Sequence, residues 1–267
     1  AASDVYKRQL DAGADIKRAI QTGQVPIGER LLSGHQNEDA LFGFDSIPFL
    51  VGSFDEHATL WEVAEPTIRE LLDGQNLHLL YSVPWPPQGL YAKKEVNSVA
   101  DMQGVKFRAY NAATSRLAEL MGAVPTKIEA AELSQAFATG TVDSMISSGS
   151  TGYDRKLWEH TKYWYNIQAW LPKNMVIVNT EAFNGLDEAT RKVVMDKAKA
   201  AEDRGWAKAE ELANWYVEEL GKNGMTVGPA GDALKADFQK IGETMTSEWL
   251  AKAGDTGKAA IDAYKAN

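Results

Sequence analysis

The chain has 267 residues and a net charge of −9, with 44% hydrophobic and 24% charged residues, which is the composition of a globular protein. No apolar run reaches the ~18 residues that a membrane span needs, and no cluster of Lys and Arg forms the basic face of a nucleic-acid binder. Because the sequence contains no cysteine, disulfides, thiolate metal sites and cysteine nucleophiles are excluded. An acidic protein that captures an anion needs a local positive site, so single arginines are of interest.

Short strand-like runs alternate with amphipathic helices along the first part of the chain, which is typical of an α/β fold. Ser53 is a good N-cap, and Pro66 suits the first position of a further helix. In chain order we expect helices over residues 15–22, 54–64 and 66–74, and strands over residues 25–32 and 77–83.

The stretch from Pro84 to Gly89 holds three prolines, so it is stiff and extended and suits a crossing between two lobes. After it we expect strands over residues 105–109 and 142–147, helices over 111–122 and 129–139, a mostly helical stretch over 151–164 and an extended one over 167–178. From Glu188 to Gly221 the helical periodicity is unbroken by proline, which predicts one long helix that spans two lobes, with Gly205 as a site for a kink. Two more helices are expected over residues 233–252 and 257–265.

Arg108 is the strongest candidate for a binding residue. It ends a strand that leads directly into a helix N-terminus, where free N–H groups and the helix dipole favour anions. A guanidinium can hold a carboxylate through two parallel hydrogen bonds. The alternative is a structural ion pair. Trp85 and Trp170 each adjoin a proline-marked break and are candidates for the apolar walls of a pocket, with core packing as the alternative.

No pattern in the sequence indicates catalysis. The four histidines, His35, His57, His78 and His160, show no paired spacing and adjoin no nucleophile. Dinucleotide-binding, Walker A and nucleophile-elbow motifs are lacking. We therefore expect no catalytic residue, no metal site and no cofactor.

Several stretches together resemble the extracytoplasmic solute-binding subunit of tripartite ATP-independent periplasmic (TRAP) transporters, of the dicarboxylate-binding type. The most specific is Val99–Arg108, in which Asp101, Gly104, Lys106 and Arg108 form a D-x-x-G-x-K-x-R pattern. The other stretches are Asp15–Glu29, Asp45–Phe49, Gly122–Thr126, Glu132 and Ala136–Asp143.

This resemblance implies an α/β, two-lobed periplasmic-binding-protein-like fold (type II-like) with a hinged cleft and a long lobe-spanning helix. Lobe I is then expected to comprise residues 1–85 and 173–212, and lobe II residues 86–172 and 213–267. Family members begin with a strand, a helix and a return strand. The chain lacks a match to this unit and its first nine residues match nothing in the family, so we expect the N-terminal strand–helix unit to be missing.

The resemblance also suggests how a ligand is held. The family arginine that corresponds to Arg108 pairs with the ligand carboxylate. Ser147 stands where the family often has Asn, and Gln88 stands where it often has a second Arg, which favours a monocarboxylate, or an acid with a polar or aromatic body, over a dicarboxylate. The expected ligand-binding residues are Arg108, Trp85, Gln88, Ser147, Trp170, Asn174 and Glu29, with Glu29 receiving a polar group of the ligand.

The function implied is that of a periplasmic solute-binding protein. It would capture a small organic acid and deliver the acid to the TRAP membrane permease, without catalysis and without nucleic acid as a partner. Two alternatives stay open: a ligand-sensing domain of the same fold, and an enzyme built on a two-lobed scaffold.

Overall fold

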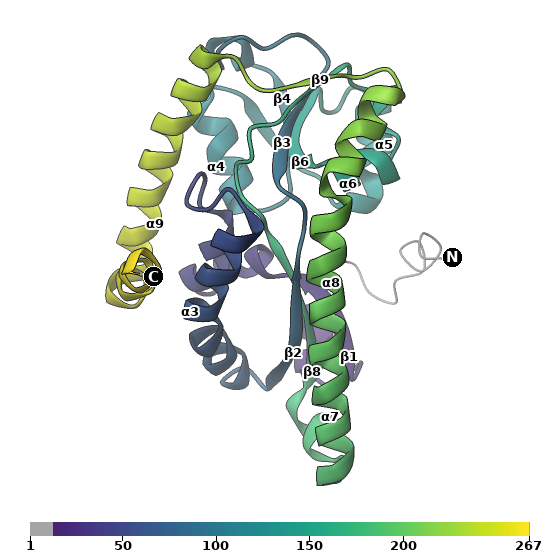
Figure 1. Cartoon of the computed structure of the whole chain (residues 1–267), viewed down its shortest axis with the longest axis vertical. Helices are drawn as coiled ribbons and strands as arrows, with labels where there is room; N and C mark the ends of the chain where they lie inside the picture. Colours follow the sequence, from purple (N-terminus) through teal and green to yellow (C-terminus); the bar gives the residue numbers. More distant parts are fainter. Residues whose placement is uncertain (1–12, 267) are drawn as a thin grey trace.

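Two β-sheets, one in each of two lobes, organise the chain in the computed structural model, which describes residues 13–266 (Figure 1). The expectation for the first nine residues therefore falls outside the described part. The α/β class and the two-lobed arrangement agree with the sequence-based expectation, and a long helix, α8, runs beside both lobes (Figure 1).

The sheet of lobe I has three strands, and both of its pairings are antiparallel. In spatial order the strands are β1 (Ile27–Leu31), β8 (Lys173–Asn179) and β2 (Leu77–Pro84). Met175 and Ile177 of β8 are buried in a core that also contains residues of α3, whereas Val178 packs into a second cluster with Ala198 of α8. The alternation of side chains along one strand thus gives each face of the sheet its own covering helix.

Helix α3 (Phe54–Asp73) is a single helix, where the sequence predicts two. Its N-terminus is as expected, because the Ser53 hydroxyl accepts a hydrogen bond from the Glu56 N–H at 3.2 Å. Pro66 lies inside the helix and does not end it. The buried residues Leu60, Ala64 and Ile68 keep helical spacing across Pro66, so burial of this face offsets the missing hydrogen bond.

The sheet of lobe II has six strands and is mixed. In spatial order they are β5 (Val124–Lys127), β4 (Lys106–Ala109), β6 (Ser144–Ser148), β3 (Gln88–Ala92), β7 (Tyr163–Tyr165) and β9 (Thr226–Gly228). Its helices are α4 (Ala112–Leu120), α5 (Leu133–Ala138) and α6 (Gly149–Asp154). The prediction of a mostly helical stretch over residues 151–164 was wrong at its end, since β7 pairs with β3 and β9 there.

Short elements complete the chain. They are α2 (Ile16–Gln21), α7 (Thr180–Asn184) and the 3-10 helices η1 (Leu32–His35), η2 (Ala40–Ser46), η3 (Val99–Met102), η4 (Ala130–Glu132) and η5 (Leu157–Glu159). None of the helices within residues 13–266 combines the length and the apolar character needed to cross a bilayer.

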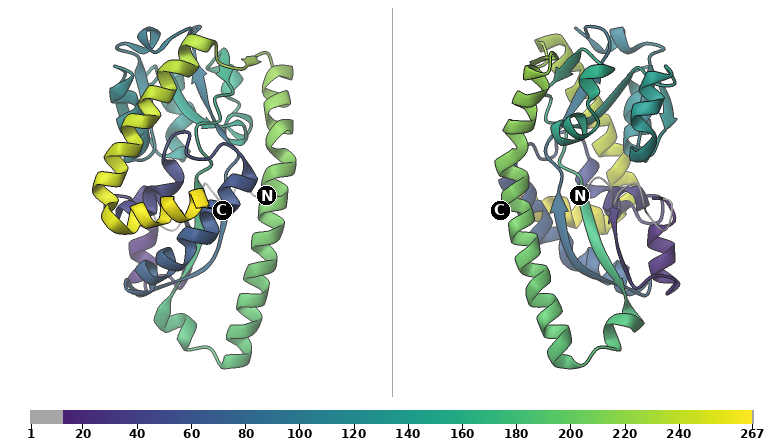
Figure 2. Two further views of the ribbon diagram at one scale, coloured as in Figure 1. Left: turned by 60° about the vertical axis from the view of Figure 1, so that its left-hand side comes forward. Right: turned by 90° about the vertical axis from the view of Figure 1, so that its right-hand side faces the viewer.

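The lobes are joined by the stretch from β2 to β3, the stretch from β7 to β8, and the helices α8 (Glu188–Lys222) and α9 (Asp232–Ala266) (Figure 2). Helix α9 bends at Gly254, whose φ of 58° lies in the left-handed region that glycine adopts readily. After this bend the helix turns across lobe I (Figure 2). Trp249 and Ile261 of α9 belong to the lobe I core, so we propose that the end of the chain belongs with lobe I rather than with a lobe II that extends over residues 213–267.

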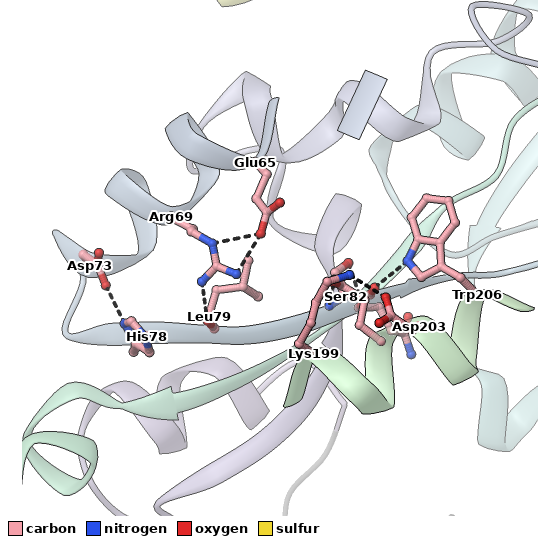
Figure 3. A network of polar contacts seen from close by, with 11 residues as sticks. Glu65, Arg69, Asp73, His78, Leu79, Ser82, Lys199, Asp203 and Trp206 are labelled. Carbon is pink, nitrogen blue, oxygen red and sulfur yellow. Dashed lines mark hydrogen bonds and ion pairs between the residues drawn. The ribbon is translucent and has the colours of Figure 1, made fainter. Parts of the chain in front are cut away.

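Strand β2 is braced from both sides where it approaches the crossing (Figure 3). Arg69 of α3 donates to the Leu79 carbonyl and pairs with Glu65, while Trp206 of α8 donates its indole N–H to the Ser82 carbonyl at 3.0 Å. Gly205 makes the close approach of α8 possible, because a Cβ there would lie 2.6 Å from a methyl group of Val83. Gly205 is thus a packing position and not a kink.

Candidate functional site

Three of the predicted binding residues meet at one edge of the lobe II sheet. Arg108 lies near the end of β4, and Ser147 lies near the end of β6, which is parallel to β4. Gln88 begins β3, which is antiparallel to β6, and its neighbour Gly89 pairs with Ser147. The ends of three adjacent strands therefore lie side by side, although Gln88 and Ser147 are 59 residues apart in the sequence.

Arg108 is buried, with 5% of its surface exposed, yet no carboxylate in the described chain pairs with it. Its Nε donates to the Ile128 carbonyl at 2.9 Å, and its guanidinium lies over the Tyr110 ring at 5.0 Å. Burial lowers the pKa of Arg108 to about 10, so the group stays cationic at neutral pH. The two terminal nitrogens have no hydrogen-bond acceptor among residues 13–266, so they remain able to donate to an anion.

Tyr110 joins the site, although the sequence analysis missed it. Its hydroxyl accepts a hydrogen bond from the Trp170 indole at 2.9 Å and donates one to the Gln88 side-chain oxygen at 3.3 Å. Burial raises the pKa of Tyr110, so the hydroxyl keeps its proton. Strand β4 ends at Ala109 and Tyr110 lies in the bend before α4, so the sequence offers no distinctive signal for this residue.

Ser147 and Trp170 differ in what they offer to a ligand. Ser147 is 5% exposed and its hydroxyl has no partner among the described residues, so it is free to donate or accept. Trp170 is fully buried in the lobe II core and its indole N–H is engaged by Tyr110. Trp170 therefore holds the Tyr110 hydroxyl, and its part in the wall of a ligand pocket stays a prediction.

The remaining predicted residues form a separate chain of hydrogen bonds at the crossing. The Trp85 indole donates to the Asn174 side-chain oxygen at 2.8 Å, and the Asn174 amide donates to Glu29 at 2.7 Å. Glu29 of β1 is exposed. Asn174 of β8 pairs with Leu31 of β1, two residues after Glu29. The structure brings these three residues together at the lobe I edge, but records no contact between them and Arg108.

The lobes touch each other across the site through the N-terminus of α4. The Asn111 amide donates to the Ser33 hydroxyl at 2.9 Å and to the Ser46 hydroxyl at 3.4 Å. With its oxygen facing α4, the Gln36 side chain accepts from the N–H groups of Ala113 at 2.7 Å and Ala112 at 3.0 Å. In this orientation a side chain of lobe I, rather than a ligand, satisfies these N–H groups, and the expectation that they attract an anion stays a prediction.

A second contact between the lobes carries charge. Arg30 of β1 and Glu129, which follows β5, approach to 3.7 Å. The Arg30 Nε and one Glu129 oxygen are buried without hydrogen-bond partners among residues 13–266. The negative charge of Glu129 acts to raise the pKa of Arg108, against the larger effect of burial. Sequence spacing offers no signal for this pair, because the two residues lie in different lobes.

Buried ionisable groups lie behind the site in lobe I. Asp45 is buried and accepts a hydrogen bond from the Lys173 backbone N–H at 2.7 Å; burial raises the pKa of its carboxyl to about 7. The Lys173 ammonium lies 3.8 Å from the centre of the Trp206 ring and 4.4 Å from that of Trp61, and no residue in the described part of the chain accepts a hydrogen bond from it. Burial lowers the pKa of Lys173 to about 7.

No histidine contacts Arg108, Gln88 or Ser147 in the described structure. His35 pairs with Glu38, His78 with Asp73, and His160 stacks on Phe137. His57 is buried and stacks on Trp206. No group of three or more His, Asp or Glu side chains in residues 13–266 is arranged to hold a metal ion.

A cavity of about 680 Å³ lies elsewhere, between α8, β9 and α9. Its walls are largely apolar, with Phe49, Ile167 and Phe238 among them, and its single cation is the exposed Lys235. A buried cation without a partner binds a carboxylate more strongly than an exposed one. The unpaired donors at the sheet edge, and not this cavity, therefore form the candidate site.

The family model of the bacterial extracellular solute-binding proteins, family 7, matches residues 7–253. The chain belongs to this family. The expectation that the first nine residues match nothing in the family was therefore wrong for residues 7–9. Members of the family and the solved structures that resemble the chain are solute-binding receptors, and the TRAP-type solute-binding function expected from the sequence is confirmed.

Three solved structures are similar to this family 7 protein over 96–97% of its chain and 85–86% of theirs, each with a TM-score of 0.95. One is a TRAP solute-binding protein from a marine metagenome, 49% identical, specific for pyroglutamate and solved with co-purified pyroglutamate. Two are extracytoplasmic solute receptors of Bordetella pertussis that bind pyroglutamic acid, 45% and 44% identical. The ectoine-binding TRAP protein of Halomonas elongata is 19% identical with a TM-score of 0.88 and supports the fold alone.

Proposed function

We propose that this family 7 protein captures pyroglutamate, or a closely related five-membered cyclic monocarboxylate, in the periplasm and delivers it to a TRAP membrane permease. The observation that carries the proposal is the buried guanidinium of Arg108, which has no carboxylate partner within residues 13–266. Proteins 44–49% identical to the chain bind this acid, which supports the same class of ligand here.

The donors at the sheet edge suit one carboxylate together with a second acceptor. Arg108 would hold the carboxylate through its two terminal nitrogens, and the Ser147 hydroxyl would add a donor. Gln88 supplies an uncharged amide where a second cation would favour a dicarboxylate, so a neutral carbonyl oxygen fits it better than a second anion.

Lobe I would complete the enclosure of the ligand. Trp85 forms an apolar wall beside the ring, and Asn174 and Glu29 provide acceptors for the ring N–H of a lactam. Trp170 closes the opposite side behind Tyr110. Closure of the lobes removes water and strengthens each of these polar contacts.

The proposed role is transport and not catalysis. The site offers hydrogen-bond donors and apolar walls. Of the side chains that most often act as general bases, His35, His78 and His160 contact Glu38, Asp73 and Phe137 instead.

A thermal-shift screen of small organic acids tests the proposal. Pyroglutamate at 100 times its Kd is expected to stabilise the folded protein by about 2.7 kcal/mol. Proline, which shares the ring but lacks the lactam carbonyl, and succinate, a dicarboxylate, should give much smaller shifts at the same concentration. A clear shift with succinate and none with pyroglutamate would contradict the proposal.

A further inference from the structure

Arg30 of β1 is a second guanidinium group that makes no hydrogen bond within residues 13–266. Its side chain is 12% exposed, and its Nε is fully buried. The carboxylate recorded beside it is that of Glu129, with nitrogen and oxygen 3.7 Å apart, which is too far for a hydrogen bond but close enough to neutralise its charge. Glu29 precedes Arg30 but faces the other side of the strand and accepts from Asn174 instead.

Glu129 lies between Arg30 and the proposed carboxylate anchor. The Arg108 Nε donates to the carbonyl of Ile128, the residue before Glu129, at 2.9 Å. The negative charge of Glu129 also favours the cationic form of Arg108. One carboxylate is therefore close to a guanidinium group from each lobe.

The other charges recorded around this carboxylate are positive. The Lys127 ammonium lies 3.8 Å from the second Glu129 oxygen, and Arg155, which follows α6, acts on Arg108 as a like charge. In a chain with a net charge of −9, such a local group of cations attracts anions. If the charge of Glu129 were removed, the same cations would offer a second positive centre to a ligand.

We propose that Glu129 determines the charge selectivity of the site: by neutralising Arg30 it leaves Arg108 as the cation available to a ligand, so that monoanions are preferred to dianions. The inference rests on the proposed function and deepens it. A monoanion needs one guanidinium group, whereas the second carboxylate of a dianion is repelled by Glu129 and finds no free cation. Glu129 thus contributes repulsion of the wrong ligand and not a contact with the right one.

Three acids separate the effect of charge from that of shape. Pyroglutamate is the cyclic monoanion. Glutarate has the same five-carbon backbone in open form, with a second carboxylate in place of the ring carbonyl, and is a dianion at neutral pH. Glutaramate has the shape of glutarate but carries an amide in place of one carboxylate, so it is a monoanion.

Calorimetric titration of the three acids into the wild type and Glu129→Gln provides the test, with displacement of pyroglutamate for the weaker ligands. The substitution keeps the size of the side chain and removes its charge. We expect the ratio of the Kd for glutarate to the Kd for pyroglutamate to fall at least about tenfold, because a like charge is removed and Arg30 is freed. The ratio for glutaramate should change by less than about threefold, since the two monoanions carry equal charge.

Two further variants assign the effect to the pair. Glu132→Gln removes the same charge from an exposed position of η4 and should leave both ratios unchanged. Arg30→Met combined with Glu129→Gln removes the freed cation as well, so the preference for pyroglutamate over glutarate should return to within about threefold of the wild-type value.

The outcomes are distinct. An unchanged glutarate ratio in Glu129→Gln, an equal fall in Glu132→Gln, or no return in the double variant would overturn the inference and leave the proposed function intact. If the wild type binds glutarate too weakly to measure, measurable binding by Glu129→Gln supports the inference and its absence overturns it. If thermal melting shows that Glu129→Gln does not fold, Glu129→Met replaces it with the same two outcomes. A wild type that does not bind pyroglutamate would instead contradict the proposed function, and the inference with it.

Discussion

The ammonium group of Lys173 is buried and, in the described structure, contacts aromatic rings instead of hydrogen-bond acceptors. Its ammonium lies against Trp206 and Trp61, which attract a cation, but burial penalises the charged form more strongly and lowers its pKa to about 7. In the unfolded chain the ordinary value of 10.5 applies. Between pH 7 and 10.5 the unfolded chain holds more protons at Lys173 than the folded protein does, so the free energy of unfolding rises with pH. The destabilisation that comes from burying Lys173 is fully present below pH 7.

Lys173→Met is therefore expected to stabilise the protein at pH 7 by about 1 kcal/mol or more, because it removes the cost of burying an amine whose pKa is lowered from 10.5 to about 7. The variant should also lack the part of the rise in stability between pH 7 and 10.5 that comes from Lys173. Urea unfolding at several pH values measures both effects. Lys192→Met, at an exposed position of α8, is the control and should change little. A Lys173→Met protein that is less stable than the wild type at every pH would show that the aromatic rings favour the cation.

At the residue scale, the residues expected to contact a ligand could be predicted from the sequence, whereas the residue that bonds to them, Tyr110, could not. Arg108, Gln88 and Ser147 were predicted, and the sheet brings them to one edge. Whether they bind ligand stays a prediction. Tyr110 was missed because a tyrosine next to a helix start has no distinctive pattern, and its role depends on Trp170, 60 residues away in the sequence.

At the scale of elements, α4 is a point of contact between the lobes. Its first N–H groups are satisfied by Gln36 of lobe I, and its N-cap Asn111 bonds to Ser33. These contacts can form only when the lobes approach each other, so they stabilise the closed arrangement without touching the ligand.

Gln36→Ala should therefore speed ligand release, with koff raised about three- to tenfold and the association rate changed less, as is usual for interface substitutions. Stopped-flow tryptophan fluorescence with pyroglutamate measures both rates. Gln239→Ala, at an exposed position of α9, serves as the control. Equal release rates for Gln36→Ala and the wild type would show that the contact does not hold the lobes together.

Helix α8 depends on a glycine where it crosses β2. In an exposed helix, Gly→Ala stabilises by about 0.5–1 kcal/mol. At Gly205 the added methyl group would lie 2.6 Å from a methyl group of Val83, so the sign reverses. We expect Gly205→Ala to destabilise the protein by about 1–3 kcal/mol through overpacking. Gly221→Ala, on the same helix with its nearest neighbour 3.9 Å away, should be neutral or stabilising; thermal melting of both variants decides, and equal effects would contradict the packing role.

The elements that sequence reasoning placed well are those with a strong local signal. Helix α8 was predicted almost to the residue because its periodicity and the cap at Asp187 are local. Two predictions failed for non-local reasons. Pro66 does not divide α3, since the apolar face on both sides of it packs against one core, and β7 is a three-residue strand that exists only through pairing with β3 and β9.

At the scale of the whole molecule, the two-lobed α/β fold was predicted from the alternation of strands and helices together with the family resemblance, and the family and the fold are confirmed. How the lobes meet could not be predicted, because the contacts of Gln36, Asn111 and Arg30 join segments that share no local pattern. Which ligand fits depends on how the lobes contact each other, since in the proposed function residues of both lobes enclose the ligand.

Calorimetric titration of pyroglutamate into the wild type and Arg108→Ala tests the central claim most directly. We expect a single site in the wild type and a loss of about 2 kcal/mol or more, roughly a 30-fold higher Kd, in the variant, because a charged hydrogen-bond partner is removed. Arg116→Ala, an exposed arginine paired with Glu248, should bind like the wild type. Unchanged affinity in Arg108→Ala would contradict the assignment of Arg108 as the carboxylate anchor.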